Sequence, residues 1–382
     1  MMMEMTIRDT PNIADAGPTE GVAVTFPVGV TLPSKHGVLT IDGSAGEGGG
    51  QILRSSLTLS LLTGTPFVLE HIRAGRRKPG LMRQHLTCVR AAAKVCGARV
   101  EGAELGSERL RFEPGPVVAG DYAFEVGSAG SACLVLQTVV LPLALVDGPS
   151  AMTVSGGTHA KWAPPAPFLA QAWLPILARM GAPIGYELRG AGFYPAGGGR
   201  IHLTLPGNAE LRPLSLAPRV GGLDVEVHAV VSNLSETIAQ RELDAAAKGL
   251  GDQAATLHSA TLRSRGPGNA CWLVAKGAEI TNVFTAIGDK GLRAETVAAA
   301  VVSAFDVWRA SDTAVDAHLT DQLMLPIAMA GAGDFTCPPL SLHSQTNLAV
   351  VAAFTDLRFK VFPLDDTATR FRVVLRPAAK AS

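Results

Sequence analysis

A structural pattern that recurs along the chain limits its possible folds more than any other feature. The pattern is a helix followed by glycine and two short strands, and its first copy is predicted at Leu81–Cys96, Gly97, Arg99–Glu101 and Arg109–Phe112. A second copy is predicted at Pro167–Met180, Gly181, Ile184–Leu188 and Arg200–Leu205, and a helix with two strands returns at Asn347–Phe354, Arg358–Phe362 and Arg370–Leu375. Gly97 and Gly181 lie 84 residues apart. The sequence thus indicates a repeated unit of roughly 80 residues that packs sheets against helices, with chance recurrence of a common element order as the alternative.

Composition and a change of pattern near residue 210 predict the fold class and the domains. The chain has 382 residues, 41 glycines and only 5% aromatic residues, so we expect an aliphatic core between closely spaced layers and an α+β fold. The segment 211–310 carries its own predicted strands, at Leu223–Val231, Leu257–Leu262 and Ala270–Val274, and predicted helices at Glu236–Leu250 and Ala294–Ala310. We therefore expect a small α+β domain at 211–310, inserted into a large repeat-built domain at 37–210 and 311–382, after a flexible tail at 1–36.

Charge and cysteine content exclude several classes of protein. Lys+Arg and Asp+Glu number 33 each, which argues against coating of nucleic acid by a uniform positive field, so any RNA contact must be local. The five cysteines form no C-x-x-C pair, which speaks against a disulfide framework or a zinc ribbon and favours a reducing, cytoplasmic location. The first residues lack the features of a secretory signal, and the longest apolar stretch, Leu134–Val146, is too short to span a bilayer.

A glycine-rich segment, GEGGGQILR at Gly46–Arg54, follows a predicted strand and opens a predicted helix at Gln51–Leu62, which Gly64 is expected to end. Backbone N–H groups and the helix dipole at such a junction favour phosphate. Glu47 is a candidate ligand for a divalent metal on a nucleotide, and Arg54 is a candidate phosphate contact. No G-K-[ST] follows, so the segment is not a Walker A loop, and a flexible turn with a solvated glutamate is the alternative.

A basic segment, RAGRRKPGLMRQH at Arg73–His85, gathers five arginines and lysines within eleven residues and contains no acidic residue. The planar fork of arginine suits bidentate capture of phosphate. In a chain of balanced charge this cluster indicates an anion site, and a solvated basic loop is the alternative.

Two more segments open predicted apolar helices with residues that suit a ligand. One is Gly127–Thr138, which places Gln137 on an otherwise apolar helix, although a core glutamine bonded to the backbone is the commoner case. The other is HLTDQ at His318–Gln322, where the aspartate is also an ordinary helix cap.

His343 differs from the other histidines because it lies in a polar segment, SLHSQTN, immediately before a predicted apolar helix. A neutral imidazole is nucleophilic near pH 7, and its attack on phosphorus gives a phosphoramidate that passes its nucleotide onward readily. A single histidine is by itself weak evidence for catalysis. No H-E-x-x-H or other metal-binding spacing joins the nine histidines.

Seven segments together resemble RNA 3′-terminal phosphate cyclases in order and spacing. They span roughly Gly37–Val374 and read GEGGGQILR, RAGRRKPGLMRQHL, GSAGSACLVLQT, SGGTHAKWAPP, GFYPAGGG, HLTDQLMLPIAMAGAG and HSQTN. The resemblance implies a large domain of repeated units, similar to the C-terminal domain of bacterial translation initiation factor three, with a smaller α+β domain inserted.

The resemblance also implies a ligase that forms a phosphoric ester bond, with ATP and a divalent metal, Mg²⁺ or Mn²⁺, as cofactors. In this family a histidine, here His343, takes AMP from ATP and passes it to an RNA 3′-phosphate. The neighbouring 2′-hydroxyl then closes a 2′,3′-cyclic phosphate and expels AMP. The partner is an RNA with a 3′-phosphate end, and the chain is a candidate homodimer.

Site residues follow from the same resemblance, position by position. Glu47 resembles the metal-binding acid, and Arg54 and Arg73 resemble phosphate-contacting catalytic arginines. The nucleotide-binding positions are Gln84, Gln137, Pro164, His318, Leu319, Thr320, Asp321 and Gln322. His318 departs from the family pattern, because a well-known bacterial member has Tyr there, and an imidazole offers less area for stacking on adenine.

Two other functions compete with this interpretation. One is a non-catalytic relative that works in ribosome biogenesis and lacks the nucleophilic histidine, whereas this sequence has His343 together with Arg54 and Arg73. The other is an enolpyruvyl transferase of similar repeat-built architecture, which would use an arginine-lined anion site but would form no covalent adenylate.

Overall fold

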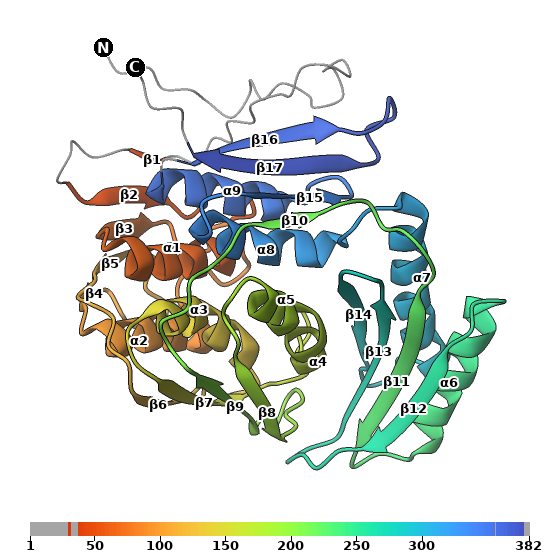
Figure 1. The fold of residues 1–382 in the computed structure, drawn as a ribbon. Helices are drawn as coiled ribbons and strands as arrows, with labels where there is room; N and C mark the ends of the chain where they lie inside the picture. The colour runs from red at the N-terminus through yellow and green to blue at the C-terminus, as the bar shows by residue number, and fades with distance from the viewer. Residues whose placement is uncertain (1–29, 32–36, 356, 378–382) are drawn as a thin grey trace. The chain divides into compact units, whose positions relative to one another are not determined.

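The structure is a computed structural model that describes residues 30–31, 37–355 and 357–377 (Figure 1). Contacts between Cα atoms divide the chain into two compact units. Unit 1 comprises Met1–Val117, Leu211–Pro218 and Thr313–Ser382, and unit 2 comprises Val118–Glu210 and Arg219–Asp312. The domain boundaries expected at residues 210 and 310 stay a prediction. Of the tail predicted at 1–36, the described residues are Val30–Thr31, which form strand β1; the rest lies outside the described residues.

The first copy of the repeat lies in unit 1. It consists of β2 (Leu39–Asp42), α1 (Gly50–Thr63), β3 (Phe67–Glu70), α2 (Arg83–Cys96), β4 (Arg99–Glu101) and β5 (Leu110–Glu113). Its sheet has the order β1-β2-β3-β5-β4, with β2 parallel to β3 and the other pairs antiparallel. Gly64 and Gly97 end the two helices with φ of 70° and 62°, in the left-handed region that favours glycine. Both predicted helix ends are confirmed.

The second copy lies in unit 2. It consists of β6 (Asp121–Glu125), α3 (Ala132–Leu145), β7 (Ser150–Gly156), α4 (Ala166–Phe168), η3 (Leu169–Trp173), α5 (Leu174–Arg179), β8 (Gly185–Gly190) and β9 (Gly199–Leu205). The sheet order is β6-β7-β9-β8. The single helix expected over Pro167–Met180 is therefore three segments, because the π-helical turn η3 interrupts it.

The third copy returns to unit 1. It consists of β10 (Leu214–Leu216), α8 (Ala317–Met329), β15 (Gly333–Cys337), α9 (Leu342–Phe354), β16 (Leu357–Pro363) and β17 (Phe371–Pro377). In its sheet, β10-β15-β17-β16, the first strand is parallel to the second and the remaining pairs are antiparallel. The first two copies have the same order and the same directions. The predicted recurrence and the α+β class are confirmed.

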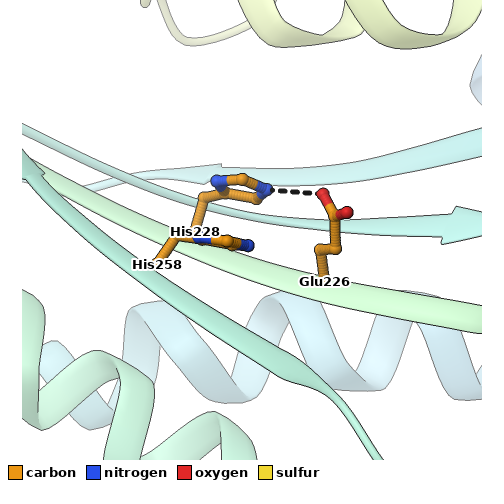
Figure 2. Close-up of side chains that lie close together, drawn as sticks. All are labelled: Glu226, His228 and His258. Atoms are coloured by element: carbon orange, nitrogen blue, oxygen red, sulfur yellow. Dashed lines mark hydrogen bonds and ion pairs between the residues drawn. The ribbon is translucent and has the colours of Figure 1, made fainter.

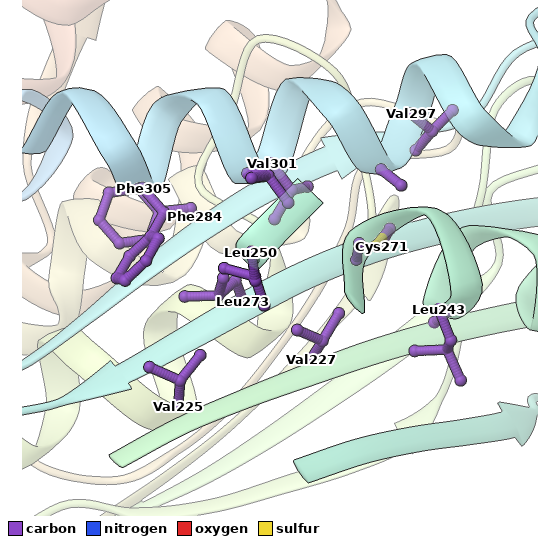
Figure 3. Packing of buried hydrophobic residues seen from close by; sticks show 14 of the residues in the cluster. Val225, Val227, Leu243, Leu250, Cys271, Leu273, Phe284, Val297, Val301 and Phe305 are labelled. Carbon is purple, nitrogen blue, oxygen red and sulfur yellow. The ribbon is translucent and has the colours of Figure 1, made fainter. Parts of the chain in front are cut away.

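The segment between β10 and α8 forms a fourth sheet, which has a different topology. It consists of β11 (Asp224–Ser232), β12 (Thr256–Thr261), β13 (Gly268–Lys276) and β14 (Thr281–Ile287), in the order β12-β11-β13-β14, with helices α6 (Thr237–Leu250) and α7 (Ala294–Ser311). Figure 3 shows Val225 and Val227 of β11 and Leu273 of β13 packed with Val301 and Phe305 of α7. Because side chains alternate along a strand, Glu226 and His228 lie on the opposite face of β11.

No helix in the described part of the chain is long and apolar enough to cross a membrane. The five cysteines are buried and form no disulfide bond.

Candidate active site

The glycine-rich segment forms a tight loop between β2 and the first turn of α1. Gly46 and Gly48 both have φ of 59°, and Gly49 is the N-cap residue of α1 and provides no side-chain hydrogen bond to the helix. The N–H groups of a helix's first turn have no partner within the helix, and with the helix dipole they attract anions. The loop therefore has the geometry of a phosphate-binding turn.

Two further glycines of this loop are required by close packing. A Cβ atom on Gly49 would overlap the carboxylate of Glu47, and one on Gly50 would overlap the imidazole of His85. The basic segment approaches the same loop, since a Cβ atom on Gly75 would lie 3.6 Å from the carbonyl oxygen of Gly48. The structure thus brings the two predicted anion-binding segments together.

His343 lies in the first turn of α9. The sequence placed it in a loop before a helix starting near Asn347, and this prediction was wrong by about one turn. The reason is Ser341, whose Oγ accepts a hydrogen bond from the backbone N–H of Ser344 at 3.1 Å and caps the helix. The side chain of His343 is 52% exposed, so its ring is accessible to a ligand.

The ring of His343 contacts two residues of the glycine-rich segment. Its Nδ1 lies 2.8 Å from Oε1 of Gln51 and 4.0 Å from Oε2 of Glu47. Partial burial and the positive charges of Arg54 and Arg76 lower the pKa of His343 below 6.5. The imidazole is therefore neutral at pH 7, as a nucleophile requires.

Glu47 is held at the centre of this group. Its backbone N–H donates to Oγ1 of Thr346 at 3.0 Å, and its carboxylate forms an ion pair with Arg76. The side chain is only 7% exposed, and among the described residues neither oxygen accepts a hydrogen bond of ordinary geometry. Arg76 pairs with Oε1, and Oε2, which accepts no hydrogen bond from the described residues, fits a divalent cation. Mg²⁺ needs few protein ligands when phosphate oxygens and water supply the others.

Buried polar contacts link α1, α8 and α9 beneath the histidine. Nε2 of Gln51 donates to Oδ2 of Asp321 at 3.4 Å, and Nε2 of Gln322 donates to Oδ1 of the same carboxylate. Nδ2 of Asn347 donates to the carbonyl oxygen of Asp321 at 2.8 Å, and its Oδ1 accepts from Ser55 Oγ at 2.7 Å. Burial raises the pKa of Asp321 to about 6.

The two predicted catalytic arginines differ in their surroundings. Arg54 is half-buried on α1, and burial lowers its pKa, although a guanidinium stays charged in proteins. Arg73 has φ of 58°, and its Nη1 donates to the carbonyl oxygens of Lys78 at 2.7 Å and Gly80 at 2.8 Å, which closes the basic loop. Burial and the charges of Arg54 and Arg73 lower the pKa of the neighbouring His85 to about 3.

The remaining predicted site residues fall in both units. Gln84 is half-buried in α2, and α8 carries His318, which is exposed, Leu319 and Thr320, which are buried, and Gln322, which is half-buried. Gln137 lies in α3 and Pro164 precedes α4, both half-buried in unit 2. The N-cap residue of α8 is Asp316, whose carboxylate accepts hydrogen bonds from the N–H groups of His318 and Leu319. Asp321 therefore does not cap the helix.

Sequence reasoning gave no role to Gln51, Thr346 or Asn347, and it recognised Arg76 only as a member of the basic cluster. Each belongs to a segment that was recognised, GEGGGQILR, RAGRRKPGLMRQH or HSQTN. Gln51, Thr346 and Asn347 are polar residues near the starts of α1 and α9, the two helices that begin at candidate ligands. That position is the sequence signal that could have indicated them.

Comparisons with known proteins identify the family of the chain. The family model described as RNA 3′-terminal phosphate cyclase matches residues 45–361. A protein of Ralstonia nicotianae named RNA 3′-terminal phosphate cyclase is 50% identical over 324 residues, which cover 85% of this chain and 93% of the relative. A protein of the same name from Salmonella typhimurium is 48% identical over 322 residues, covering 84% and 95% of the two chains. The chain belongs to the RNA 3′-terminal phosphate cyclase family.

Proposed function

We propose that this chain is an enzyme that converts the 3′-phosphate of an RNA into a 2′,3′-cyclic phosphate at the expense of ATP. The observation that carries the proposal is the accessible imidazole of His343, 4.0 Å from the buried carboxylate of Glu47 and beside a phosphate-binding turn. Membership of the cyclase family supports the overall reaction.

The reaction has three steps. First, the ring nitrogen of His343 attacks the α-phosphorus of ATP, a P–N bond forms, and pyrophosphate leaves. Second, an oxygen of the RNA 3′-phosphate attacks the same phosphorus, which breaks the P–N bond and gives an RNA-adenylate anhydride. Third, the 2′-hydroxyl loses its proton and attacks the terminal RNA phosphorus, and AMP leaves. Activation is needed because a phosphate monoester lacks a good leaving group.

Hydrogen bonding selects the nitrogen that attacks. An ionised Asp321 only accepts hydrogen bonds, so Gln51 must turn its NH₂ group toward Asp321 and its carbonyl oxygen toward His343. The carbonyl oxygen in turn requires a proton on Nδ1 of His343. The lone pair of the neutral ring is then on Nε2, which we assign as the nucleophile.

Replacement of Asp321 by asparagine tests this assignment. An amide donates as well as accepts, so Gln51 can reverse and stabilise the wrong tautomer of His343. We expect enzyme–AMP formation at pH 7.5 to slow on the order of 10- to 100-fold, the usual effect of losing a partner that orients a histidine. Measurement of initial rates by quenched labelling with α-labelled ATP would decide this, and an unchanged rate would remove Asp321 from the mechanism.

The same variant has a pH signature that a purely structural role would not give. The pKa of Asp321 is raised to about 6, so its carboxyl gains a proton as the pH falls through that value. It then becomes a donor, which releases Gln51. The pKa of His343 is lowered, and protonation of its ring slows the wild type and the variant alike. We therefore expect the ratio of the wild-type rate to the Asp321→Asn rate to fall toward one below about pH 6.

Charges and dipoles around the histidine suit the nucleotide. Glu47 would hold the divalent metal, Mg²⁺ or Mn²⁺, and that metal would neutralise charge on the triphosphate. We assign Arg54, Arg73 and Gln84 to phosphate contacts. We also assign nucleotide contacts to Gln137, Pro164, His318, Leu319, Thr320, Asp321 and Gln322. For Asp321 this comes in addition to its positioning of Gln51.

The wider setting belongs to the same proposal. We infer a large domain of repeated units like the C-terminal domain of translation initiation factor three, with the 211–310 segment inserted. We also infer a cytoplasmic location, where thiols stay reduced, and a homodimer. The competing non-catalytic function would not account for the accessible His343 or for the hydrogen bonds that connect it through Gln51 to Asp321.

One assay tests the function directly. An oligoribonucleotide with a 3′-phosphate, incubated with ATP and Mg²⁺ or Mn²⁺, should become resistant to phosphatase as the cyclic end forms. An oligonucleotide with a 2′-deoxy sugar at its 3′ end should stop at the adenylate, since it has no 2′-hydroxyl. If the RNA end stays sensitive to phosphatase while phosphoenolpyruvate is consumed with an acceptor alcohol, the enolpyruvyl transferase is the correct function.

A further inference from the structure

Three potential metal ligands meet on the sheet of unit 2 formed by β11 to β14. Glu226 and His228 come from β11 and His258 comes from its parallel neighbour β12, where it is in register with His228. They lie on the face opposite helices α6 and α7, and Figure 2 shows the three side chains grouped above the strands. Glu226 and His228 are half-buried and His258 is exposed.

The distances suit an ion after a small movement. One ligand atom from each side chain lies within 4.8 Å of the others, and Nε2 of His228 is 3.2 Å from Oε2 of Glu226. Around a tetrahedral ion with bonds of about 2.0–2.1 Å, ligand atoms are roughly 3.3 Å apart. The Glu226–His228 pair already has that spacing. The ring of His258, at the edge of the sheet, needs only a side-chain rotation.

Neighbouring groups hold the first two ligands in place. Trp272 of β13 stacks on the ring of His228, with centroids 4.9 Å apart and planes at 3°. The ring of His258 also stacks on that of His228, at 4.5 Å, and leaves this stack when it rotates toward the ion. Lys276 forms an ion pair with Oε1 of Glu226, which leaves Oε2 facing the imidazole. Asp224 lies 3.9 Å from the same lysine.

The local charge also suits a cation. Lys276 opposes one, and the carboxylates of Asp224 and Glu226, which both pair with this lysine, offset its charge.

We propose that Glu226, His228 and His258 bind one divalent transition-metal ion of the zinc class, with water in the remaining position. Two imidazoles and a carboxylate suit Zn²⁺, Co²⁺ or Ni²⁺, whereas Mg²⁺ and Ca²⁺ prefer oxygen ligands. Among the described residues this is the sole group of three such ligands within bonding reach. It is separate from Glu47, which lies in unit 1.

The ion would cross-link an exposed edge strand, β12, to its neighbour β11. All six residues of β12 are exposed, and that strand pairs only with β11 in its sheet. Coordination joins the two strands through side chains. Because the ion would bind the folded state and not the unfolded chain, its binding would stabilise unit 2.

The test uses the full chain, freed of metal by a chelator and kept in excess Mg²⁺ so that hard-cation sites are filled. Equilibrium dialysis with Zn²⁺, and Co²⁺ substitution followed by visible absorption, give the stoichiometry, the affinity and the geometry. We expect one tight equivalent in the wild type and a tetrahedral Co²⁺ spectrum. In His258→Ala and Glu226→Gln we expect binding at least 100-fold weaker.

The matched control is His202→Ala, in the same unit, which removes a half-buried imidazole that contacts Thr153 at 2.9 Å. It should bind the ion as the wild type does. Circular dichroism checks that each variant is folded, and His258→Gln replaces His258→Ala if the latter is not. Equal Zn²⁺ affinity in the wild type and the His258 variant, or equal loss in His202→Ala, would overturn the proposal. So would the absence of binding tighter than about 0.1 mM in the wild type.

Discussion

His343→Ala is expected to abolish covalent labelling of the protein by ATP labelled at the α-phosphate, to below about one-thousandth of the wild-type level. The variant removes the ring whose Nε2 we assign as the nucleophile. The nearby His85 is no substitute, because it is buried and its Nδ1 accepts a hydrogen bond from the N–H of Met82 at 3.3 Å. The label on the wild-type protein should be acid-labile, as a phosphoramidate is.

Folding should survive this change. The side chain of His343 is 52% exposed, and the substitution removes one hydrogen bond to Gln51, a loss of about 1 kcal/mol. His202→Ala serves again as the matched control and should label normally. The melting temperature and the label are measured on the same samples, and label that persists in a folded His343→Ala protein would assign the nucleophile to another residue.

Gly46→Ala is expected to produce the second large loss, on the order of 100-fold in the rate of enzyme–AMP formation. A Cβ atom at Gly46 would overlap Oγ1 of Thr346. That oxygen accepts from the backbone N–H of Glu47 at 3.0 Å and donates to the carbonyl of Leu342 at 2.7 Å. Threonine is stiff about χ1, so relief of the overlap breaks these bonds and separates Glu47 from the helix that carries His343.

The chain offers a matched control for the backbone contribution. Gly97 has φ of 62°, close to the 59° of Gly46, but a Cβ atom there would meet nothing within 4 Å. Both alanine variants therefore lose about 1–2 kcal/mol of stability to the left-handed conformation. Only Gly46→Ala should lose a further ~1–3 kcal/mol and the activity. Equal behaviour of the two variants in denaturant unfolding and in labelling would contradict the steric explanation.

Local signals in the sequence were sufficient to predict many of the helices and strands. Helix ends at Gly64 and Gly97 were predicted correctly because few residues other than glycine adopt positive φ there. The start of α9 was missed because Leu342 and His343 give no apolar periodicity, and the helix depends on the cap at Ser341. Strand β14 was also missed, since its inclusion in the sheet depends on pairing with β13.

The candidate site shows the same division. Glu47, Arg54 and His343 were predicted as residue types suited to phosphate chemistry, and α1 and α9 bring them together. The bond between His343 and Gln51 joins positions 292 residues apart, which no local pattern reports. Nor does the basic segment indicate that Nη1 of Arg73 donates hydrogen bonds to the carbonyl oxygens of Lys78 and Gly80. The contact between His343 and Gln51 arises only when α9 packs against α1, and the contacts of Arg73 depend on how the basic loop closes.

The packing of α9 against the glycine-rich loop has a consequence for protein synthesis. A ribosome adds about 5–20 residues each second, so the 292 positions between Gln51 and His343 take roughly 15 to 60 seconds to translate. During that interval the growing polypeptide contains the GEGGG turn but lacks the histidine that we propose accepts AMP. Under the proposed mechanism, nascent chains stay inert toward covalent capture of the nucleotide until α9 has emerged and docked.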